Sequence, residues 1–126
     1  MSSRPRSPGR PAPSAPSESD YKEAISAALE LLQRRWVLRI VWELRAGPLN
    51  FRELQAACGN LSTSVLNVRL NELRSALLVV HQPDNGYLLS EHGHSLMKAA
   101  RPLMQWSAHW AWSTGLAQRQ EVAPTR

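Results

Sequence analysis

The sequence has a single cysteine and no long apolar run. Cys58 excludes a disulfide within the chain and leaves only an intermolecular disulfide or a free thiol. No stretch approaches the roughly 20 apolar residues that cross a bilayer, and the N-terminus lacks the apolar region of a signal peptide. We therefore expect a cytoplasmic protein.

The residue patterns of catalysis are also missing. The sequence contains no paired acids, no nucleophile elbow and no glycine-rich phosphate loop, so it predicts no catalytic residue and no enzyme. His92 and His94 form the only tight histidine pair. Residues two apart point to different sides of a helix, and the chain offers no evident set of further zinc ligands. We expect no metal site and no cofactor.

Charge is mildly basic and unevenly distributed. Lys and Arg total 15 against 10 acidic residues, a net charge of +5, which suits a polyanionic partner without requiring one. Residues 1–20 carry six serines, five prolines and three arginines, and this composition predicts a disordered tail. We expect one domain over residues 21–117 and a flexible C-terminus over residues 118–126.

The spacing of apolar residues predicts helices over residues 21–34, 35–46, 51–58 and 62–76, and a long helix after residue 90. One face of the first helix, which includes Ile25 and Leu29, is expected to be buried. Asn50, Ser62 and Ser90 are the expected N-caps. Pro102 should kink the last helix, because its ring clashes with a carbonyl one turn earlier.

Two short apolar segments, Leu77 to Val80 and Tyr87 to Leu89, separate the last two helices and predict a β-hairpin. Asn85-Gly86 would supply the positive-φ residues of a tight turn. No Lys or Arg occurs from residue 75 to residue 97. The order of elements predicts a mainly α fold with a small β-hairpin, which is a winged helix-turn-helix. Its wing contains no Lys or Arg.

Short motifs between Glu23 and Trp106 follow a family pattern. They are Ala28-Leu29-Glu30-Leu31-Leu32, Arg35-Trp36, Glu43-Leu44, Gly47-Pro48, Phe51-Arg52-Glu53-Leu54, Ser62, Leu66, Arg69-Leu70, Glu72-Leu73, Leu78, Tyr87, Leu89, Gly93, Ser95-Leu96 and Trp106. These residues resemble the HxlR-type winged helix-turn-helix transcriptional regulators of bacteria. The resemblance implies a homodimer joined by its first and last helices, with two recognition helices presented to successive major grooves of a pseudo-palindromic operator.

The sequence departs from that family pattern at four places. Glu23 stands where some members carry a cysteine that senses electrophiles or oxidants, so thiol sensing is unavailable there. Gln33-Arg34 replaces a usual Gly-Gly, which suggests a stiffer or more continuous junction between the first two helices. Arg39 and Trp42 stand where the family tends to have an aliphatic and a basic residue. The wing is shorter than usual and lacks basic residues.

The outer face of the recognition helix carries the candidate DNA contacts. Its polar members are Thr63, Ser64, Asn67 and Asn71, which could bond base edges or phosphates. Arg69, Arg74 and Arg52 are candidates for phosphates. A salt bridge from Arg69 to an acid such as Glu72 or Glu53 is an equal alternative, and Arg52 could be plain surface. The alternative for the whole face is a well-capped, solvated helix.

Three of the five tryptophans lie in the segment MQWSAHWAW. The expected dimer interface comprises Ile25, Leu29, Leu96, Ala99, Leu103, Trp106 and Trp110. A second hypothesis, compatible with the first, is an apolar pocket for an aromatic ligand, formed between the dimer helices by Trp106, Trp110 and Trp112 with Trp42 or Trp36 nearby. Cys58 is expected to pack in the core rather than to serve redox chemistry.

The sequence thus predicts a dimeric regulator of transcription, a repressor gated by an apolar aromatic ligand. Three explanations fit a wing that lacks basic residues. Arg4, Arg6 and Arg10 of the tail could replace the wing as a flexible arm. A ligand or partner could set the dimer geometry of a weak DNA binder. Alternatively, the fold is a small-molecule-binding or protein-interaction module that has lost operator binding.

Overall fold

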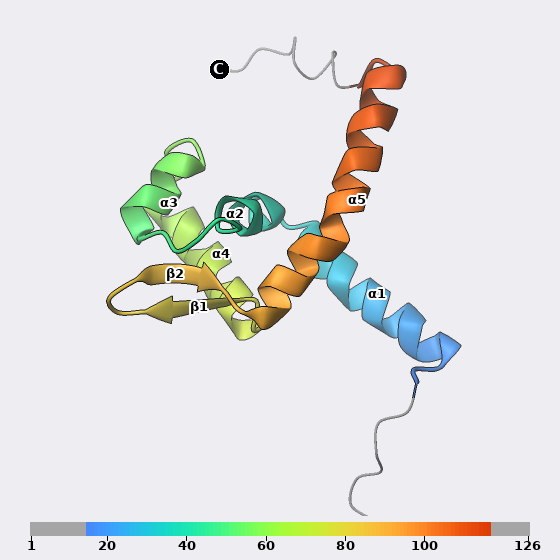
Figure 1. Ribbon diagram of the computed structural model, residues 1–126, viewed down its shortest axis with the longest axis horizontal. Helices are drawn as coiled ribbons and strands as arrows, with labels where there is room; N and C mark the ends of the chain where they lie inside the picture. Colours follow the sequence, from blue (N-terminus) through green and yellow to red (C-terminus); the bar gives the residue numbers. More distant parts are fainter. Residues whose placement is uncertain (1–14, 117–126) are drawn as a thin grey trace, which may run out of the picture. The chain divides into compact units, whose positions relative to one another are not determined.

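The computed structural model describes residues 15–116. The chain divides into two units at Arg34 (Figure 1). The predicted disordered tail lies outside the described residues as far as residue 14, and the predicted flexible C-terminus lies outside them entirely.

The first unit contains the helix α1, Glu18–Leu32. It begins three residues before the predicted start at Tyr21, because Ser17 and Asp20 form a capping box in which each side chain accepts a bond from the other residue's N–H. The bonds from the backbone N–H and the hydroxyl of Ser17 lower the pKa of Asp20. Ile25 and Leu29 are each 55% exposed and no residue of α1 is buried, so the predicted buried face is not covered by the described chain.

The junction before the second unit is not continuous. Residues 33–36 separate α1 from the next helix, and Trp36 adopts the left-handed conformation with φ 79°. A bulky residue in this region costs about 1 kcal/mol or more. The two helices therefore remain separate, and the prediction that Gln33-Arg34 makes the junction stiffer or more continuous than Gly-Gly stays a prediction.

The second unit, as far as it is described, contains four helices and a two-stranded antiparallel sheet. In chain order they are α2 Val37–Glu43, α3 Phe51–Ala57, α4 Thr63–Ser75, β1 Val79–Gln82, β2 Gly86–Leu89 and α5 Glu91–Ser113 (Figure 1). The N-caps Asn50, Ser62 and Ser90 each accept a bond from the N–H three residues on, as predicted. The fold is the predicted winged helix-turn-helix.

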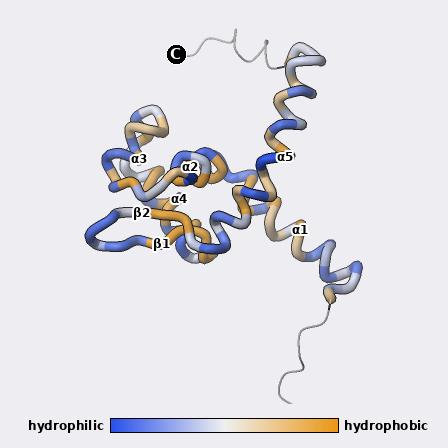
Figure 2. The backbone as a smooth tube through the Cα atoms, in the orientation of Figure 1, coloured by the Kyte–Doolittle hydropathy of each residue, from blue (hydrophilic) through white to orange (hydrophobic). Residues whose placement is uncertain are grey.

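The core forms around the short helix α2, which contacts both α3 and α5. The buried side chains of α2 and its C-cap, and those of α4, recur at helical spacing. They are Val37, Ile40, Val41 and Leu44, followed by Leu66, Leu70 and Leu73. Leu54, Cys58, Leu61, Val79, Leu89, Met97 and Ala100 complete the core. Figure 2 shows the hydrophobic stretches of α2, α4 and the hairpin where these elements converge.

The first strand of the hairpin, β1, lies two residues later in the sequence than predicted, at Val79–Gln82 instead of Leu77 to Val80. The register runs from Val79 opposite Leu89 to Gln82 opposite Gly86. The turn is therefore formed by residues 83–85, and only Gly86 has a positive φ, of 91°. The prediction of positive φ is therefore confirmed for Gly86 and wrong for Asn85, while a left-handed Leu77 (φ 63°) lies between α4 and the start of β1.

Leu49 extends the hairpin by one isolated bridge, which the sequence analysis missed. The N–H of Leu49 donates to the Tyr87 carbonyl at 2.9 Å, and the N–H of Tyr87 returns a bond to the Leu49 carbonyl at 2.8 Å. A single bridging residue gives no alternating pattern that sequence reading could detect. The bridge ties the segment that starts the helix-turn-helix to the wing.

We expect Gly86→Ala to lower the free energy of unfolding by about 2 kcal/mol. A Cβ at Gly86 would lie 2.5 Å from the Leu49 carbonyl oxygen and would also force an alanine to φ 91°. Gly59→Ala is the matched control, because Gly59 has φ 77° with open space around its Cβ position. Urea denaturation should rank Gly86→Ala well below Gly59→Ala in stability, and equal losses would contradict the close packing of the bridge.

Helix α5 begins where Gly93 packs closely on the hairpin, since a Cβ there would overlap the Leu78 carbonyl oxygen. The helix continues through Pro102, and its direction changes part-way along its length (Figure 1). A proline removes one backbone hydrogen bond from a helix interior, which accounts for a bend. Among residues 15–116, no helix is both long and apolar enough to span a membrane.

Candidate nucleic-acid interface

The turn between α3 and α4 is held by one glutamine side chain. Nε2 of Gln55 donates to the Leu61 carbonyl at 2.8 Å and to Thr63 Oγ1 at 3.3 Å. The N–H of Asn60 returns a bond to the Gln55 carbonyl at 2.9 Å. Gly59 and Asn60 both have positive φ, which reverses the chain between the helices. Gln55 was not among the predicted site residues, because its role depends on contacts made across the turn.

The outer face of α4 is exposed and largely polar. Ser64, Asn67 and Asn71 lie opposite the buried leucines and form no hydrogen bond to another described residue, while Thr63 is also exposed but contacts Gln55. Val68 shares this face and is 50% exposed. An exposed valine in a recognition helix can contact a thymine methyl group. Val68 was not among the predicted DNA contacts, although its spacing from Ser64 and Asn71 places it on the same helix face.

The structure separates the arginines into two kinds. Arg69 is engaged within the fold: Nε donates to the Arg35 carbonyl at 2.8 Å, and one terminal nitrogen lies 2.9 Å from Glu72. Of the two roles that the sequence left equal, this geometry favours the structural one. Arg52 and Arg74 are exposed and form no ion pair within residues 15–116, so their guanidinium groups are available to phosphates.

Arg39, a departure from the family pattern, also has a structural role. Its Nε lies 2.7 Å from Glu43, and a terminal nitrogen donates to the Ala57 carbonyl at 2.8 Å. That carbonyl belongs to the last residue of α3, where a cation stabilises the end of a helix. Arg39 therefore fixes α2 to the first helix of the helix-turn-helix.

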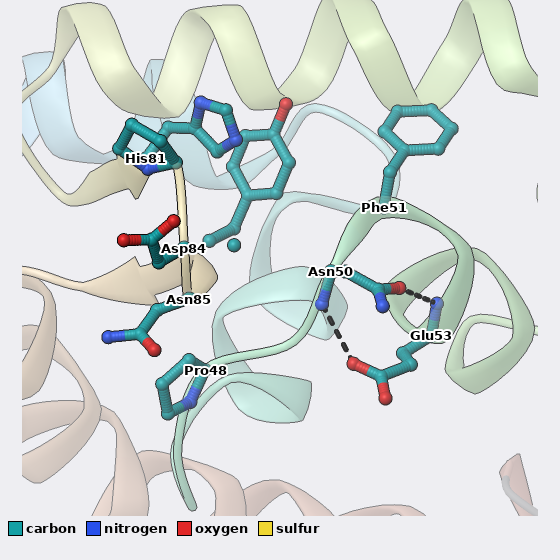
Figure 3. A pocket seen from close by; sticks show the side chains of 10 residues that line it. Pro48, Asn50, Phe51, Glu53, His81, Asp84 and Asn85 are labelled. Atoms are coloured by element: carbon teal, nitrogen blue, oxygen red, sulfur yellow. Dashed lines mark hydrogen bonds between the residues drawn. The ribbon is translucent and has the colours of Figure 1, made fainter.

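The wing presents one acid, Asp84, and no Lys or Arg beside the start of α3. A hollow of about 570 Å³ lies between the wing and the start of α3 (Figure 3). Its lining residues are Pro48, Asn50, Phe51, Glu53, His81, Pro83, Asp84, Asn85, Gly86 and Tyr87. The rings of His81 and Tyr87 stack with centroids 4.4 Å apart. Because Glu53 and Asp84 line the hollow without any Lys or Arg, this side of the wing cannot hold a phosphate electrostatically.

Cys58 ends α3 and is 1% exposed, which confirms its predicted place in the core. Burial raises the pKa of its thiol, an effect that the nearby Arg39 opposes and Glu43 reinforces. The thiolate is the reactive form of cysteine, so a raised pKa keeps Cys58 neutral and unreactive at pH 7.

We expect Cys58 in the native protein to react with iodoacetamide about tenfold or more slowly than in the urea-unfolded chain at pH 7. Because folding raises the pKa of the Cys58 thiol, the alkylation rate of the native protein should begin to rise at a higher pH than that of the unfolded chain. Mass spectrometry of timed samples measures both rates. Equal rates in the two states would show that the thiol is accessible and would reopen a redox role.

The five tryptophans do not gather into one pocket. Trp106 and Trp110 stack nearly parallel, with centroids 5.5 Å apart, on an exposed face of α5. Trp42 instead lines a separate hollow between α2 and α5, and Trp36 lies under the guanidinium of Arg35 at 5.3 Å. Within one described chain the tryptophans form no common pocket, and the pocket predicted between the helices of a dimer stays a prediction.

The histidines and acids of residues 15–116 form no cluster able to hold a metal ion. What the unit does assemble is a capped helix-turn-helix with an exposed polar second helix, a hairpin and a long final helix. These features define a winged helix-turn-helix protein that binds DNA.

The comparisons with known proteins agree with that class. The chain belongs to the HxlR-like helix-turn-helix family, whose model matches residues 31–114. The uncharacterized HTH-type transcriptional regulator YvaP of Bacillus subtilis (strain 168) is 31% identical over 99 residues, which cover 74% of this chain and 92% of YvaP. The protein is a DNA-binding helix-turn-helix regulator of transcription.

Solved structures show the same likeness. The quinone-bound crystal structure of YodB from B. subtilis matches with a TM-score of 0.64 and 29% identity, covering 68% of this chain and 96% of YodB. A structure described as a MarR-family transcriptional regulator, from Enterococcus faecalis V583, matches with a TM-score of 0.66 and 25% identity, covering 81% of this chain and 98% of that one.

Proposed function

We propose that the protein is a homodimeric, sequence-specific repressor that binds a pseudo-palindromic operator. The observation that carries this proposal is the outer face of α4, where Ser64, Asn67 and Asn71 are exposed on a helix fixed by Gln55. Amides and hydroxyls in this position read base edges in the major groove. Repression requires only that the bound dimer occupies DNA needed by the transcription machinery.

Two exposed apolar stripes support the dimer. On α1, Tyr21, Ile25 and Leu29 follow one another at helical spacing and are 55–61% exposed. On α5, Leu103, Trp106 and Trp110 do the same with exposures of 56%, 58% and 45%. A second copy of the chain would cover both stripes, because aromatic and aliphatic residues are typical of the buried part of protein interfaces. Leu96 and Ala99 would extend the α5 stripe, as the sequence predicted.

The DNA interface itself is weakly charged. Of the arginines proposed to reach DNA, only Arg52 and Arg74 are free of structural partners among the described residues, which gives four phosphate contacts in a dimer. We therefore propose that Arg4, Arg6 and Arg10 add contacts as an N-terminal arm. Gating by an aromatic ligand is part of the proposal, supported by the quinone-bound structure of YodB. Because Cys58 is buried, such gating would proceed without a thiol adduct.

The salt dependence of DNA binding tests the arm. Four phosphate contacts predict a slope of log K against log salt of about −4, and six further contacts from the arms of a dimer predict about −9. We expect the steeper slope for the full chain and the shallower one after deletion of residues 2–14, which leaves the Ser17 cap in place. Equal slopes for the two proteins would remove the arm from the account.

The second candidate function is a small-molecule-binding or protein-interaction module without operator binding, which the absence of Lys and Arg from the wing favours. Fluorescence anisotropy against DNA from upstream of the protein's own gene, compared with an unrelated duplex of equal length, separates the two candidates. Selective binding that weakens with salt supports the repressor. Lack of selectivity even at low salt supports the second candidate.

A further inference from the structure

A hollow of about 500 Å³ lies between α2 and α5, apart from the polar face of α4 and from the stacked pair Trp106 and Trp110. Its lining residues are Trp42, Arg45, Arg101, Met104, Gln105 and Ala108. We call it the α2–α5 hollow. Its size falls within the range of pockets that bind small molecules. The residues that line it play no part in the DNA interface or in the proposed dimer stripes.

The aromatic wall of the hollow is fixed by an arginine. The guanidinium carbon of Arg45 lies 3.7 Å from the centroid of the Trp42 ring, and one of its nitrogens donates to the Trp42 carbonyl at 2.9 Å. A guanidinium carries five N–H donors, so Arg45 keeps donors for a second acceptor. The guanidinium of arginine is planar, so it can stack on an aromatic ring and still present a fork of donors to a planar anion.

The charge of the hollow is uncompensated. Arg45 and Arg101 both line it, no acidic residue does, and neither arginine forms an ion pair within the described part of the chain. Two like charges around one hollow disfavour each other, and a bound anion relieves that repulsion. Carboxylates suit the site because arginine can bind both carboxylate oxygens.

Two of the three remaining lining residues, Met104 and Ala108, are apolar, and the third is Gln105. Met104 is half-buried and Ala108 follows it by one helical turn, so both present hydrocarbon or thioether surface beside the Trp42 ring. Methionine makes favourable contacts with aromatic rings and adapts to their shape. The hollow therefore combines a surface for a flat ring with two cations at its rim.

We propose that the α2–α5 hollow binds an aromatic carboxylate, whose ring packs on Trp42 and Met104 and whose carboxylate is held by Arg45 and Arg101. This assigns a ligand class and a site that differ from the predicted pocket of five tryptophans, in which the ligand was apolar. The regulatory meaning of the site rests on the ligand gating proposed above, whereas binding itself requires no DNA.

Helix α5 offers a route from this site to the dimer. Arg101, Gln105 and Ala108 follow one stripe of the helix, and Leu103, Trp106 and Trp110 follow the opposite stripe, as the helical period requires. Pro102 lies next to Arg101, where the helix already lacks one backbone hydrogen bond. A ligand held by Arg101 would thus act on the bend of the helix whose other side meets the partner.

Calorimetric titration of the full chain tests the site with three probes. Benzoate and 1-naphthoate carry the ring and the charge, benzamide carries the ring alone, and inorganic phosphate carries charge alone. We expect both carboxylates to bind, with benzoate about tenfold or more tighter than benzamide, since hydrogen bonds to a charged group are worth more than neutral ones. Equal affinity for benzoate and benzamide, or no carboxylate binding in the millimolar range, would overturn the proposal.

Variants locate the binding. Arg101→Gln and Arg45→Gln should each weaken benzoate about tenfold, whereas Arg52→Gln, an exposed arginine of α3, should leave it unchanged. Unaltered helical circular dichroism and melting temperature would show that the variants remain folded. Benzoate binding that survives both Gln variants, or phosphate binding as tight as benzoate, would overturn the site. Failure of the protein to bind DNA would leave these results unaffected and would overturn only the proposed repressor.

Discussion

Trp106→Glu is expected to convert the proposed dimer into monomers and to weaken operator binding by about a hundredfold or more. Trp106 is 58% exposed and stacks on Trp110 in the α5 stripe. A carboxylate placed in an apolar interface must be desolvated without a partner, which strongly disfavours association. Loss of the dimer removes the second recognition helix, and linked binding of two modules typically contributes a factor of about a hundred to ten thousand.

Trp112→Glu is the matched control for that substitution. Trp112 is equally exposed, at 57%, but it lies on a different side of α5 from Trp106 and Trp110. Sedimentation velocity should therefore find a dimer for Trp112→Glu and a monomer for Trp106→Glu. Dimers in both variants would show that the α5 stripe is not the interface, and monomers in both would show only a general effect of charge on this helix.

Ser64→Ala combined with Asn67→Ala is expected to reduce specific operator binding about a thousandfold. Good contacts with base edges are worth about 1–3 kcal/mol each, and a dimer would lose two in each half-site. Alanine favours the helix, and neither side chain has a partner among the described residues, so the fold should be retained. Binding to an unrelated duplex should persist, because Arg52 and Arg74 are unchanged.

Ser95→Ala provides the control, since Ser95 is an exposed residue of α5 away from α4. Anisotropy titrations with the operator and with an unrelated duplex give the specificity ratio of each variant. The double variant should approach a ratio of one while Ser95→Ala keeps the native value. If the double variant kept its full specificity, the outer face of α4 would not be the reading surface.

Much of this fold could be predicted because its signals are local. Asn50, Ser62 and Ser90 occur directly before helical patterns, and a capping side chain acts within three residues of itself. The inner leucines of α4 follow the helical period for the same reason. The start of α1 was misplaced although the Ser17 and Asp20 capping box is as local as the other caps. The hairpin strands were misplaced because Leu77 adopts a left-handed conformation that composition does not reveal.

The parts that could not be predicted depend on contacts between distant residues. Arg69 binds the Arg35 carbonyl, 34 positions away, and so serves the fold where the sequence also allowed a phosphate. Trp42 lies beside Arg101 and Met104, which no spacing rule connects to it. The sequence consequently identified tryptophans as ligand-binding candidates but grouped them by type, whereas the fold separates Trp42 from Trp106 and Trp110.

Selection of duplexes from a random-sequence DNA library by the full chain tests the central claim most directly. A dimer with two recognition helices predicts enrichment of an inverted repeat whose half-site centres lie about 10 base pairs, or a multiple of that, apart. No enriched sequence after repeated rounds, at a salt concentration that permits binding, would contradict the assignment of this protein as a dimeric reader of DNA.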